Sequence, residues 1–332
     1  MLKRLISPFS TTLILALALA VLPLTASAMH HEQKHRTAIV LAMFGTTVEP
    51  ALHGLLNIKA RLEKRFPHTP VKIAFTSNII RKIWQKRAAD PSYIRKHPNI
   101  PAEILKVKGP LATIADLQDE GFDNIVVQPT HIAPAEEYMD LCSYIRALDS
   151  IKTIKKRFQP FNKLAVGRPA LGTYGPRHPY ADDIAVAVRA VKADVEKARK
   201  EKATLVYMGH GNEYFPSGGS YLEFERLMNK TYPDVMTIVG TVEGFPGFER
   251  TLEILEHTKA GKVYLKPFMI VAGDHARNDM AGPEADSWKS LLEKAGIKVI
   301  PDIHGLGELD SFADIYVTHA ADAANDAGIE LK

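Results

Sequence analysis

Short apolar runs alternate with longer amphipathic stretches along most of the chain. The runs rich in β-branched residues predict strands at 37–44, 71–76, 124–129, 163–166, 203–208, 235–240, 262–270 and 298–301. Apolar residues at helical spacing predict helices at 50–66, 104–120, 180–202, 248–259 and 285–295. Strands that alternate with helices in this way are typical of parallel βαβ units.

The first four predicted strands resemble the second four. The sequence from Thr37 to Thr47, TAIVLAMFGTT, resembles ATLVYMGHGN from Ala203, and VQPTHIAPAEE from Val127 matches LKPFMIVAGDH from Leu265. We therefore expect an α/β fold of two Rossmann-like lobes, at 37–170 and 171–332. Each lobe holds a four-stranded parallel sheet flanked by helices, with a ligand cleft between the lobes. Residues 84–104 have no counterpart and predict an insertion near the cleft or at an interface, and a homo-oligomer.

The start of the chain has the pattern of a secretory leader. Lys3 and Arg4 precede an apolar run at 13–24, and Ala26-Ser-Ala28 is a typical cleavage site. The run is shorter than the ~20 residues that span a bilayer. We expect a signal peptide at 1–28, a periplasmic protein without a membrane partner after cleavage, and a flexible His-rich tail at 29–36.

Charge and cysteine content exclude several classes of protein. Without Lys3 and Arg4, the 42 basic residues fall to 40, against 38 acidic ones, and no basic block suggests nucleic acid. The single cysteine, Cys142, excludes an intrachain disulfide and fits a buried position on a helix. No G-x-S-x-G motif supports a serine hydrolase, and Ser217-Gly-Gly-Ser220 reads as a flexible loop.

Polar residues follow three successive strands of the second half. His210, Glu243 and His275 come at or just after the ends of these strands. Because the carboxyl ends of parallel strands meet at one edge, we expect the three side chains to lie together. Singly, each is more often a hydrogen-bonded core or loop residue. Together, two imidazoles and a carboxylate suit Co²⁺, Fe²⁺, Ni²⁺ or Zn²⁺. Asp274 or Asp279 could hold a ligand histidine in one tautomer, although Asp274 could equally cap a helix.

Several motifs resemble those of a known family. They are MFGT at 43–46, AFTS at 74–77, His131-Ile with Glu137-Tyr138, MGHG at 208–211, VAGDHARNDM at 271–280, DSWK at 286–289 and GLGE at 305–308. In these motifs, spread over most of the chain after the leader, the chain resembles the anaerobic-pathway sirohydrochlorin cobaltochelatases. These are class II chelatases related in fold to ferrochelatase, and their biosynthetic members are cytoplasmic, whereas this chain carries an export signal.

The resemblance implies insertion of Co²⁺, with Fe²⁺ possible, into the tetrapyrrole sirohydrochlorin without ATP. It implies that His210 and His275 are the catalytic and metal-binding pair and that Glu243 completes the site. The further residues that it assigns to tetrapyrrole binding are His131, Arg277, Phe44 and Gly45. Arg81 and Lys82 could also pair with substrate carboxylates, or simply be solvated.

The export signal motivates a second hypothesis, in which the fold carries haem, another tetrapyrrole or a metal without catalysis. An exposed histidine such as His131 or His97 would then bind the haem iron. A generic two-lobed solute-binding protein also fits the lobes and the leader. That third hypothesis leaves the convergent His210, Glu243 and His275 unexplained.

Overall fold

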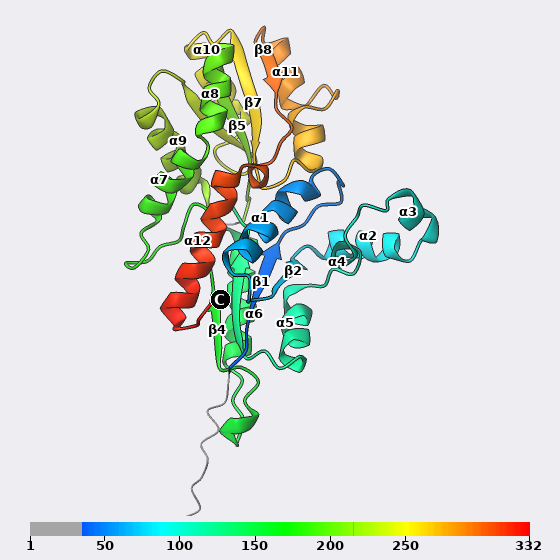
Figure 1. Ribbon diagram of the computed structural model, residues 1–332. Helices are drawn as coiled ribbons and strands as arrows, with labels where there is room; N and C mark the ends of the chain where they lie inside the picture. The colour runs from blue at the N-terminus through cyan, green and yellow to red at the C-terminus, as the bar shows by residue number, and fades with distance from the viewer. Residues whose placement is uncertain (1–34, 215) are drawn as a thin grey trace, which may run out of the picture. The chain divides into compact units, whose positions relative to one another are not determined.

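Two parallel sheets with the same strand order form the framework of the protein, whose computed structural model describes residues 35–214 and 216–332 (Figure 1). The first sheet has the order β2-β1-β3-β4, with β1 (Thr37–Met43), β2 (Val71–Phe75), β3 (Asn124–Pro129) and β4 (Lys163–Val166). The second has the order β6-β5-β7-β8, with β5 (Thr204–Gly211), β6 (Thr237–Glu243), β7 (Lys262–Phe268) and β8 (Lys298–Pro301). The predicted strands and the duplicated α/β plan are confirmed.

Both sheets are covered on both faces. The helices are α1 (Leu52–Arg65), α2 (Asn78–Ala88), α3 (Pro91–Lys96), α4 (Ala102–Leu105), α5 (Pro110–Asp119), α6 (Glu136–Asp149), α7 (Tyr180–Ala190), α8 (Lys192–Glu201), α9 (Gly218–Thr231), α10 (Phe248–His257), α11 (Trp288–Lys294) and α12 (Asp310–Ala327). Along β1, Ile39 and Leu41 join one core cluster and Ala38 and Val40 join another. This alternation with every position buried is the signature of a strand inside a parallel sheet.

Three sequence-based predictions about helices are wrong. The helix expected at 104–120 is two helices, because Pro110 starts α5 and the residue before a proline disfavours helical backbone. The helix expected at 180–202 is divided at Val191 into α7 and α8. The flexible loop expected at 217–220 is the N-cap and first turn of α9.

The last helix returns to the first lobe. Helix α12 packs against β3, β4 and α1, although its sequence follows the second lobe. The Arg61 side chain on α1 donates hydrogen bonds to the carboxylate of Asp314 on α12. Close to this helix pair, a Cβ atom on Gly54 would lie 2.8 Å from the carbonyl oxygen of Ile270. The two lobes therefore meet at backbone contact distance along α1.

A buried ion pair lies inside the second lobe. The Lys266 ammonium on β7 is 2.7 Å from Asp194 Oδ1 on α8, and both side chains are at most 1% exposed. The Tyr207 hydroxyl on β5 donates to the other oxygen of Asp194 at 2.9 Å. Losing one partner of such a pair would leave an uncompensated buried charge. The pair therefore fixes how α8 sits on the second sheet.

The predicted insertion braces the loop that follows β1. The indole N–H of Trp84 on α2 donates to the carbonyl oxygen of Thr46 at 2.8 Å. On α3, the Tyr93 hydroxyl donates to one oxygen of Glu49, and the ring of His97 contacts the other oxygen at 2.8 Å. The inserted residues therefore hold a loop at the carboxyl edge of the first sheet.

The predicted leader and residues 29–34 of the predicted tail lie outside the described residues. His35 and Arg36, at the end of that tail, both contact the carboxylate of Asp123, at 2.6 Å and 3.0 Å. Within residues 35–214 and 216–332, none of the helices combines the length and the apolar character needed to cross a bilayer.

Candidate functional site

The three predicted ligands lie together at the carboxyl edge of the second sheet. His210 is the penultimate residue of β5, Glu243 ends β6, and His275 follows β7. The two imidazole rings are edge to face, with centroids 4.9 Å apart and planes at 85°. Glu243 Oε2 lies 3.8 Å from His210 Nδ1. The structure thus brings together the side chains of two residues at the ends of β5 and β6 and of one in the segment after β7, as the sequence predicted.

A glycine allows β5 and β6 to come close at this point. Gly211 pairs with Glu243 in the sheet and has φ of +75°, a conformation that costs other residues energy. A Cβ atom on Gly211 would lie 1.9 Å from the carbonyl oxygen of Glu243. The buried Tyr221 on α9 hydrogen-bonds the Gly211 backbone, and its burial raises the pKa of its hydroxyl to about 12. This packing holds His210 beside Glu243.

Each site histidine has its Nδ1 atom engaged. His275 Nδ1 is 2.5 Å from Asp279 Oδ2 across one turn of the short π-helix at Ala276–Met280. His210 Nδ1 is 3.0 Å from the carbonyl oxygen of Gly211. In a neutral ring, an Nδ1–H that donates to oxygen leaves the Nε2 lone pair free for a cation. Of the two carboxylates left open by the sequence, Asp279 orients the ring, while Asp274 is exposed.

The three donors are adjacent but do not form a closed ligand set. Within the described ranges 35–214 and 216–332, no group of three or more His, Cys, Asp or Glu side chains is placed to hold a metal ion. The cause is visible in the geometry, because both Nδ1 atoms face protein oxygens and the two rings are perpendicular. Adding Glu243 to the two free Nε2 atoms would therefore require side-chain rotation.

The first lobe contributes the facing wall. A Cβ atom on Gly273 would lie 3.5 Å from the Thr46 hydroxyl, in the loop that the insertion braces. Across the lobes, the Asn212 amide donates to Glu136 at 3.4 Å. Glu136 and Glu137 occupy the first turn of α6. Glu136 is not among the site residues expected from the sequence, although its position after the third strand of the first lobe mirrors that of Asp274.

Phe44 and Gly45 follow β1 in this wall. The Phe44 side chain is 45% exposed, which is unusual for a large apolar residue and leaves it free to contact a flat ligand. Gly45 has φ of +99°, and a Cβ atom there would overlap the ring of Phe75. Both residues lie in the loop that follows β1, and their contact with a tetrapyrrole stays a prediction.

His131 is not the exposed histidine that the sequence suggested. Both of its ring nitrogens are buried and make no hydrogen bond within the described residues. Burial lowers the pKa of its imidazole to about 4, so the ring is neutral at pH 7. The other candidate, His97, is stacked on Tyr93 and bonded to Glu49. Neither ring offers an exposed, unengaged Nδ1.

The predicted cations have different environments. Arg81 donates to the carbonyl oxygens of Phe75 and Thr76 at the end of β2, and desolvation by burial lowers its pKa. These bonds hold its guanidinium against the backbone at the end of β2, and its pairing with a substrate carboxylate stays a prediction. Lys82 is exposed. Arg277 is also exposed, and its Nε–H donates to the carbonyl oxygen of Ala272 at 3.2 Å.

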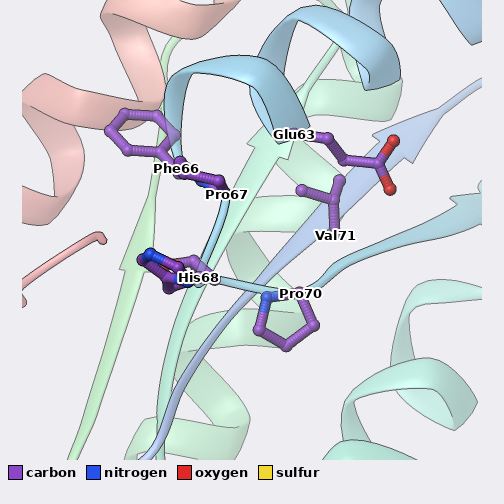
Figure 2. A pocket seen from close by; sticks show the side chains of 7 residues that line it. Glu63, Phe66, Pro67, His68, Pro70 and Val71 are labelled. Carbon is purple, nitrogen blue, oxygen red and sulfur yellow. The ribbon is translucent and has the colours of Figure 1, made fainter.

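Two hollows lie away from these residues. The first, of about 450 Å³, is at the turn between α1 and β2, where Glu63 and His68 face it along with apolar residues (Figure 2). The backbone N–H of His68 in its wall is engaged, because it donates a hydrogen bond to the carbonyl oxygen of Lys332. This hollow lies at the amino end of β2, whereas His210 lies near the carboxyl end of β5.

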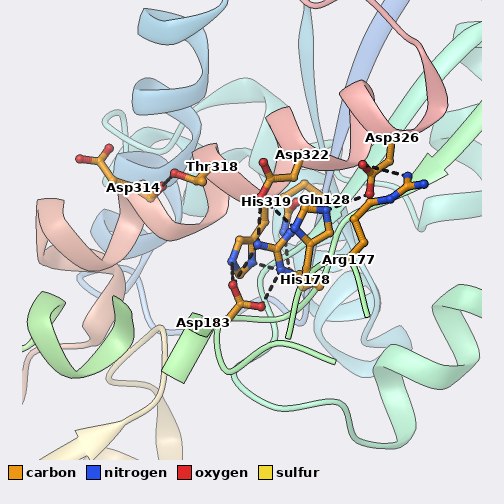
Figure 3. Close-up of polar contacts among 10 residues, drawn as sticks. Gln128, Arg177, His178, Asp183, Asp314, Thr318, His319, Asp322 and Asp326 are labelled. Carbon is orange, nitrogen blue, oxygen red and sulfur yellow. Dashed lines mark hydrogen bonds and ion pairs between the residues drawn. The ribbon is translucent and has the colours of Figure 1, made fainter. Parts of the chain in front are cut away.

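The second hollow has a volume of about 220 Å³ and is lined in part by Arg168, His178 and Asp326. Charged side chains in this region are paired with one another (Figure 3). Arg168 forms a two-pronged ion pair with Asp183, at 2.6 and 2.9 Å, and a further one with Asp322. His178 contacts Asp326 at 2.9 Å. These groups join α12 to the first lobe, and their paired charges mark a structural junction.

Cys142, the single cysteine, lies on α6. Its side chain on α6 is half-buried, less than the sequence suggested. Burial raises the pKa of its thiol, which disfavours the reactive thiolate at neutral pH.

Comparison with known proteins decides the family. The family model described as cobalt chelatase (CbiK) matches residues 37–325, which include both sheets and all three site residues. The chain belongs to the cobalt chelatase family. This chelatase is 30% identical over 295 residues to the sirohydrochlorin cobaltochelatase CbiKC of Nitratidesulfovibrio vulgaris, covering 89% of this chain and 93% of the relative. It is 27% identical to the sirohydrochlorin cobaltochelatase of Salmonella typhimurium, covering 88% and 98%.

Solved chelatase structures share the fold. The structure of SirB from Bacillus subtilis with Fe³⁺ aligns with a TM-score of 0.57 at 14% identity, covering 90% of this chain and 100% of that one. The sirohydrochlorin chelatase SirB of Bacillus subtilis subspecies spizizenii in complex with cobalt aligns with a TM-score of 0.53 at 13% identity, covering 88% and 97%. At such identity, the likeness concerns the arrangement of the two lobes.

Proposed function

We propose that this chelatase inserts Co²⁺ into sirohydrochlorin without ATP. The observation that carries the proposal is the contact between His210 and His275, with Glu243 beside them at one sheet edge. The family match and the two relatives named as sirohydrochlorin cobaltochelatases support the substrate pair. Imidazole nitrogen and carboxylate oxygen are suitable donors for Co²⁺.

The residue types divide the work of metal insertion. The free Nε2 atoms of His210 and His275 hold the arriving ion, while Asp279 keeps the His275 ring in the tautomer that exposes Nε2. Two pyrrole N–H protons must leave the macrocycle as the ion enters. The carboxylate of Glu243, 40% exposed and adjacent to His210, is placed to accept one of them, and the Nε2 atom of a histidine that the ion has left accepts the other. Because these ligands are not locked into a closed set, the ion can leave them for the macrocycle.

Anaerobic absorption spectroscopy of sirohydrochlorin with Co²⁺ tests the proposal. We expect the variant with His210→Ala and His275→Ala to lose the enzyme-dependent rate. His257→Ala, an exposed histidine at the end of α10, is the matched control and should keep it. A wild-type rate no faster than that of the double variant would contradict the catalytic role.

Fe²⁺ is the second substrate metal that we propose. The Nε2 atoms of His210 and His275 are ligands of intermediate softness, which bind both Co²⁺ and Fe²⁺. Parallel assays with the two metals at equal concentration would compare kcat/KM directly. A rate with Fe²⁺ equal to the uncatalysed rate would restrict the proposal to cobalt.

We also propose that the chain acts in the periplasm, after cleavage behind Ala28. The support is the charged start, the apolar run and the Ala26-Ser-Ala28 pattern. Fractionation and N-terminal sequencing of the tagged chain should give a periplasmic product that starts at Met29. An Ala28→Arg variant should stay uncleaved, and full-length wild-type chain in the cytoplasm would contradict export.

Haem carriage is a second candidate function, and one observation favours it. The His131 imidazole is neutral and has two unpartnered nitrogens, a state that can ligate iron once the covering groups move. Titration with haem should then shift the Soret band for wild type and not for His131→Ala. An unshifted band in wild type would exclude the role.

We infer self-association through the inserted segment. Its neighbourhood exposes Ile79, Ile83 and Ile94, at 73%, 37% and 41%. Sedimentation equilibrium should show a multiple of the chain mass for wild type. A monomer at every concentration would contradict the inference.

A further inference from the structure

The segment between α6 and β4 exposes apolar and basic side chains together. We call residues 150–158 the basic loop. Its exposed apolar residues are Ile151, Ile154 and Phe158. Its basic residues, all exposed, are Lys152, Lys155, Lys156 and Arg157. The loop holds no acidic residue, although the whole chain is close to neutral.

Hydrogen bonds within the loop give it a defined turn. Residues Lys156–Phe158 form a short 3₁₀ helix, in which the Phe158 N–H donates to the carbonyl oxygen of Lys155 at 2.9 Å. The Thr153 hydroxyl donates to the same carbonyl at 2.8 Å. Ile154 is fully exposed and Phe158 is 63% exposed on this ordered turn. Their exposure is thus a property of the fold.

None of the four cations is neutralised. Within residues 35–214 and 216–332, none of them forms an ion pair with a carboxylate, and the Arg157 guanidinium lies 4.9 Å from the centre of the Phe158 ring. Lys108, by contrast, is paired with Asp116 at 2.6 Å. Among the described residues, the loop therefore presents positive charge without a carboxylate partner around the exposed side chains of Ile154 and Phe158.

The basic loop lies at the amino end of β4 in the first sheet, whereas the candidate site lies at the carboxyl ends of strands in the second sheet. It leads into β4, and just before that strand the Asn162 N–H donates to the carbonyl oxygen of Asp123, which precedes β3. In Figure 1 it is the green segment beyond the ends where the strands begin. His210 and Glu243 lie at carboxyl ends of strands. A partner on the basic loop would leave those carboxyl ends uncovered.

We propose that the basic loop docks this chelatase on a membrane surface that contains anionic phospholipids. Ile154 and Phe158 enter the boundary between headgroups and acyl chains, while the surrounding lysines meet the lipid phosphates. A purely polyanionic partner would account for the cations but not for Ile154 and Phe158. The expectation of no membrane partner came from the short apolar run of the leader and its cleavage, which do not bear on a loop at the surface.

Co-sedimentation with vesicles tests the proposal on the chain that starts at Met29, since every described core cluster uses only residues from 38 onward. The vesicles are pure phosphatidylcholine, or equimolar phosphatidylcholine and phosphatidylglycerol. Wild type should bind the second kind more strongly. Each lost cation should weaken binding about fivefold, the equivalent of ~1 kcal/mol.

Two variants separate the contributions. Lys155→Gln with Lys156→Gln removes charge, and Ile154→Ser with Phe158→Ser removes the apolar tip. The matched control, Lys294→Gln with Lys298→Gln, makes the same change of net charge at exposed positions of the second lobe. We expect both loop variants to bind weakly, the control to bind like wild type, and all to keep their thermal midpoint and chelatase rate.

Three results would overturn the proposal. Equal binding of wild type to both kinds of vesicle would remove the role of anionic lipid. An equal loss of vesicle binding in the Lys155→Gln, Lys156→Gln variant and in the Lys294→Gln, Lys298→Gln control would show that binding depends only on the net charge of the protein. Full binding by the Ile154→Ser, Phe158→Ser variant would show a polyanion contact without insertion.

Discussion

At the scale of single residues, the contact between His275 and Asp279 sets what the site histidine can do. An imidazole has two nitrogens, and a carboxylate on Nδ1 directs the lone pair of Nε2 outward. Asp279 is 47% exposed, so its effect on folding is small while its effect on the ring orientation is direct. The sequence indicated that an aspartate would do this, and the structure selects which one.

Replacing that aspartate should therefore damage catalysis more than stability. We expect Asp279→Asn to lower metal affinity or activity about 10- to 100-fold, because the amide holds the His275 ring less firmly. Steady-state rates over a Co²⁺ titration measure the change. Asp274→Asn is the control at an exposed neighbouring carboxylate. Equal rates for Asp279→Asn and wild type would show that the contact has no catalytic part.

His131 should make folding sensitive to mild acid. Its pKa is about 4 in the folded chain, against 6.5 for an ordinary histidine, so the unfolded chain binds the proton more readily. Stability should fall as the pH drops from 6.5 toward 4, by on the order of 2 kcal/mol at pH 5. His131→Leu should remove this loss, as judged by urea unfolding at pH 7 and pH 5. His257→Leu, at an exposed site, should keep the wild-type dependence.

Some residue roles were beyond reach of the sequence. Arg81 lies in a family motif and has the charge to meet a carboxylate, yet it is bound by carbonyl groups at the end of β2. Glu136 reaches the site only because α6 starts beside β5 in the folded chain. The Glu136 contact joins segments distant in sequence, and the Arg81 contacts depend on how the start of α2 turns back on the end of β2, so neither follows from residue type alone.

At the scale of elements, strands were predictable and helix boundaries were not. Buried parallel strands leave an unbroken run of β-branched residues, and every expected run became a strand. The start of helix α9 was not predicted, because its first turn begins with Gly218 and Gly219, which have poor helix propensity. Tertiary packing of Tyr221 and Phe224 outweighs that propensity.

The pairing of β5 with β6 should tolerate no side chain at Gly211. Gly211→Ala would combine a positive φ with a clash against the Glu243 backbone, and we expect a loss of about 1–3 kcal/mol with a marked fall in activity. Thermal unfolding and rate assays test both effects. Gly219→Ala, in open space on α9, should be neutral or slightly stabilising. Wild-type stability in Gly211→Ala would contradict the close approach.

At the scale of the whole molecule, the lobes are joined by α1, α12 and the groups around Arg168. At these elements, Arg168 is paired with Asp183 and Asp322, and Arg61 is paired with Asp314. The sequence showed the duplication of the lobes. The packing of α12 against the first sheet could not be predicted from that duplication, because the repeat comparison offered no equivalent helix.

The contact at Gly54 should therefore be sensitive to one added methyl group. We expect Gly54→Ala to cost about 1–3 kcal/mol, since its Cβ would meet the Ile270 carbonyl and Gly307. It should also lower kcat/KM by displacing the first-lobe wall. Gly261→Ala, where space is open, is the control for both measurements. Unchanged stability and kinetics in Gly54→Ala would mean that the lobes are not held at this point.

The buried pair of Lys266 and Asp194 has a consequence for assembly of the second sheet. Neighbouring residues on a strand point to opposite faces, so pairing β7 one residue out of register would move the ammonium into the apolar cluster around Val206 and Leu265. An unpaired charge there costs several kcal/mol. The native register of β7 is therefore favoured during folding. Because His275 follows β7 in the chain, its position at the sheet edge depends on Lys266, a residue buried away from the candidate site.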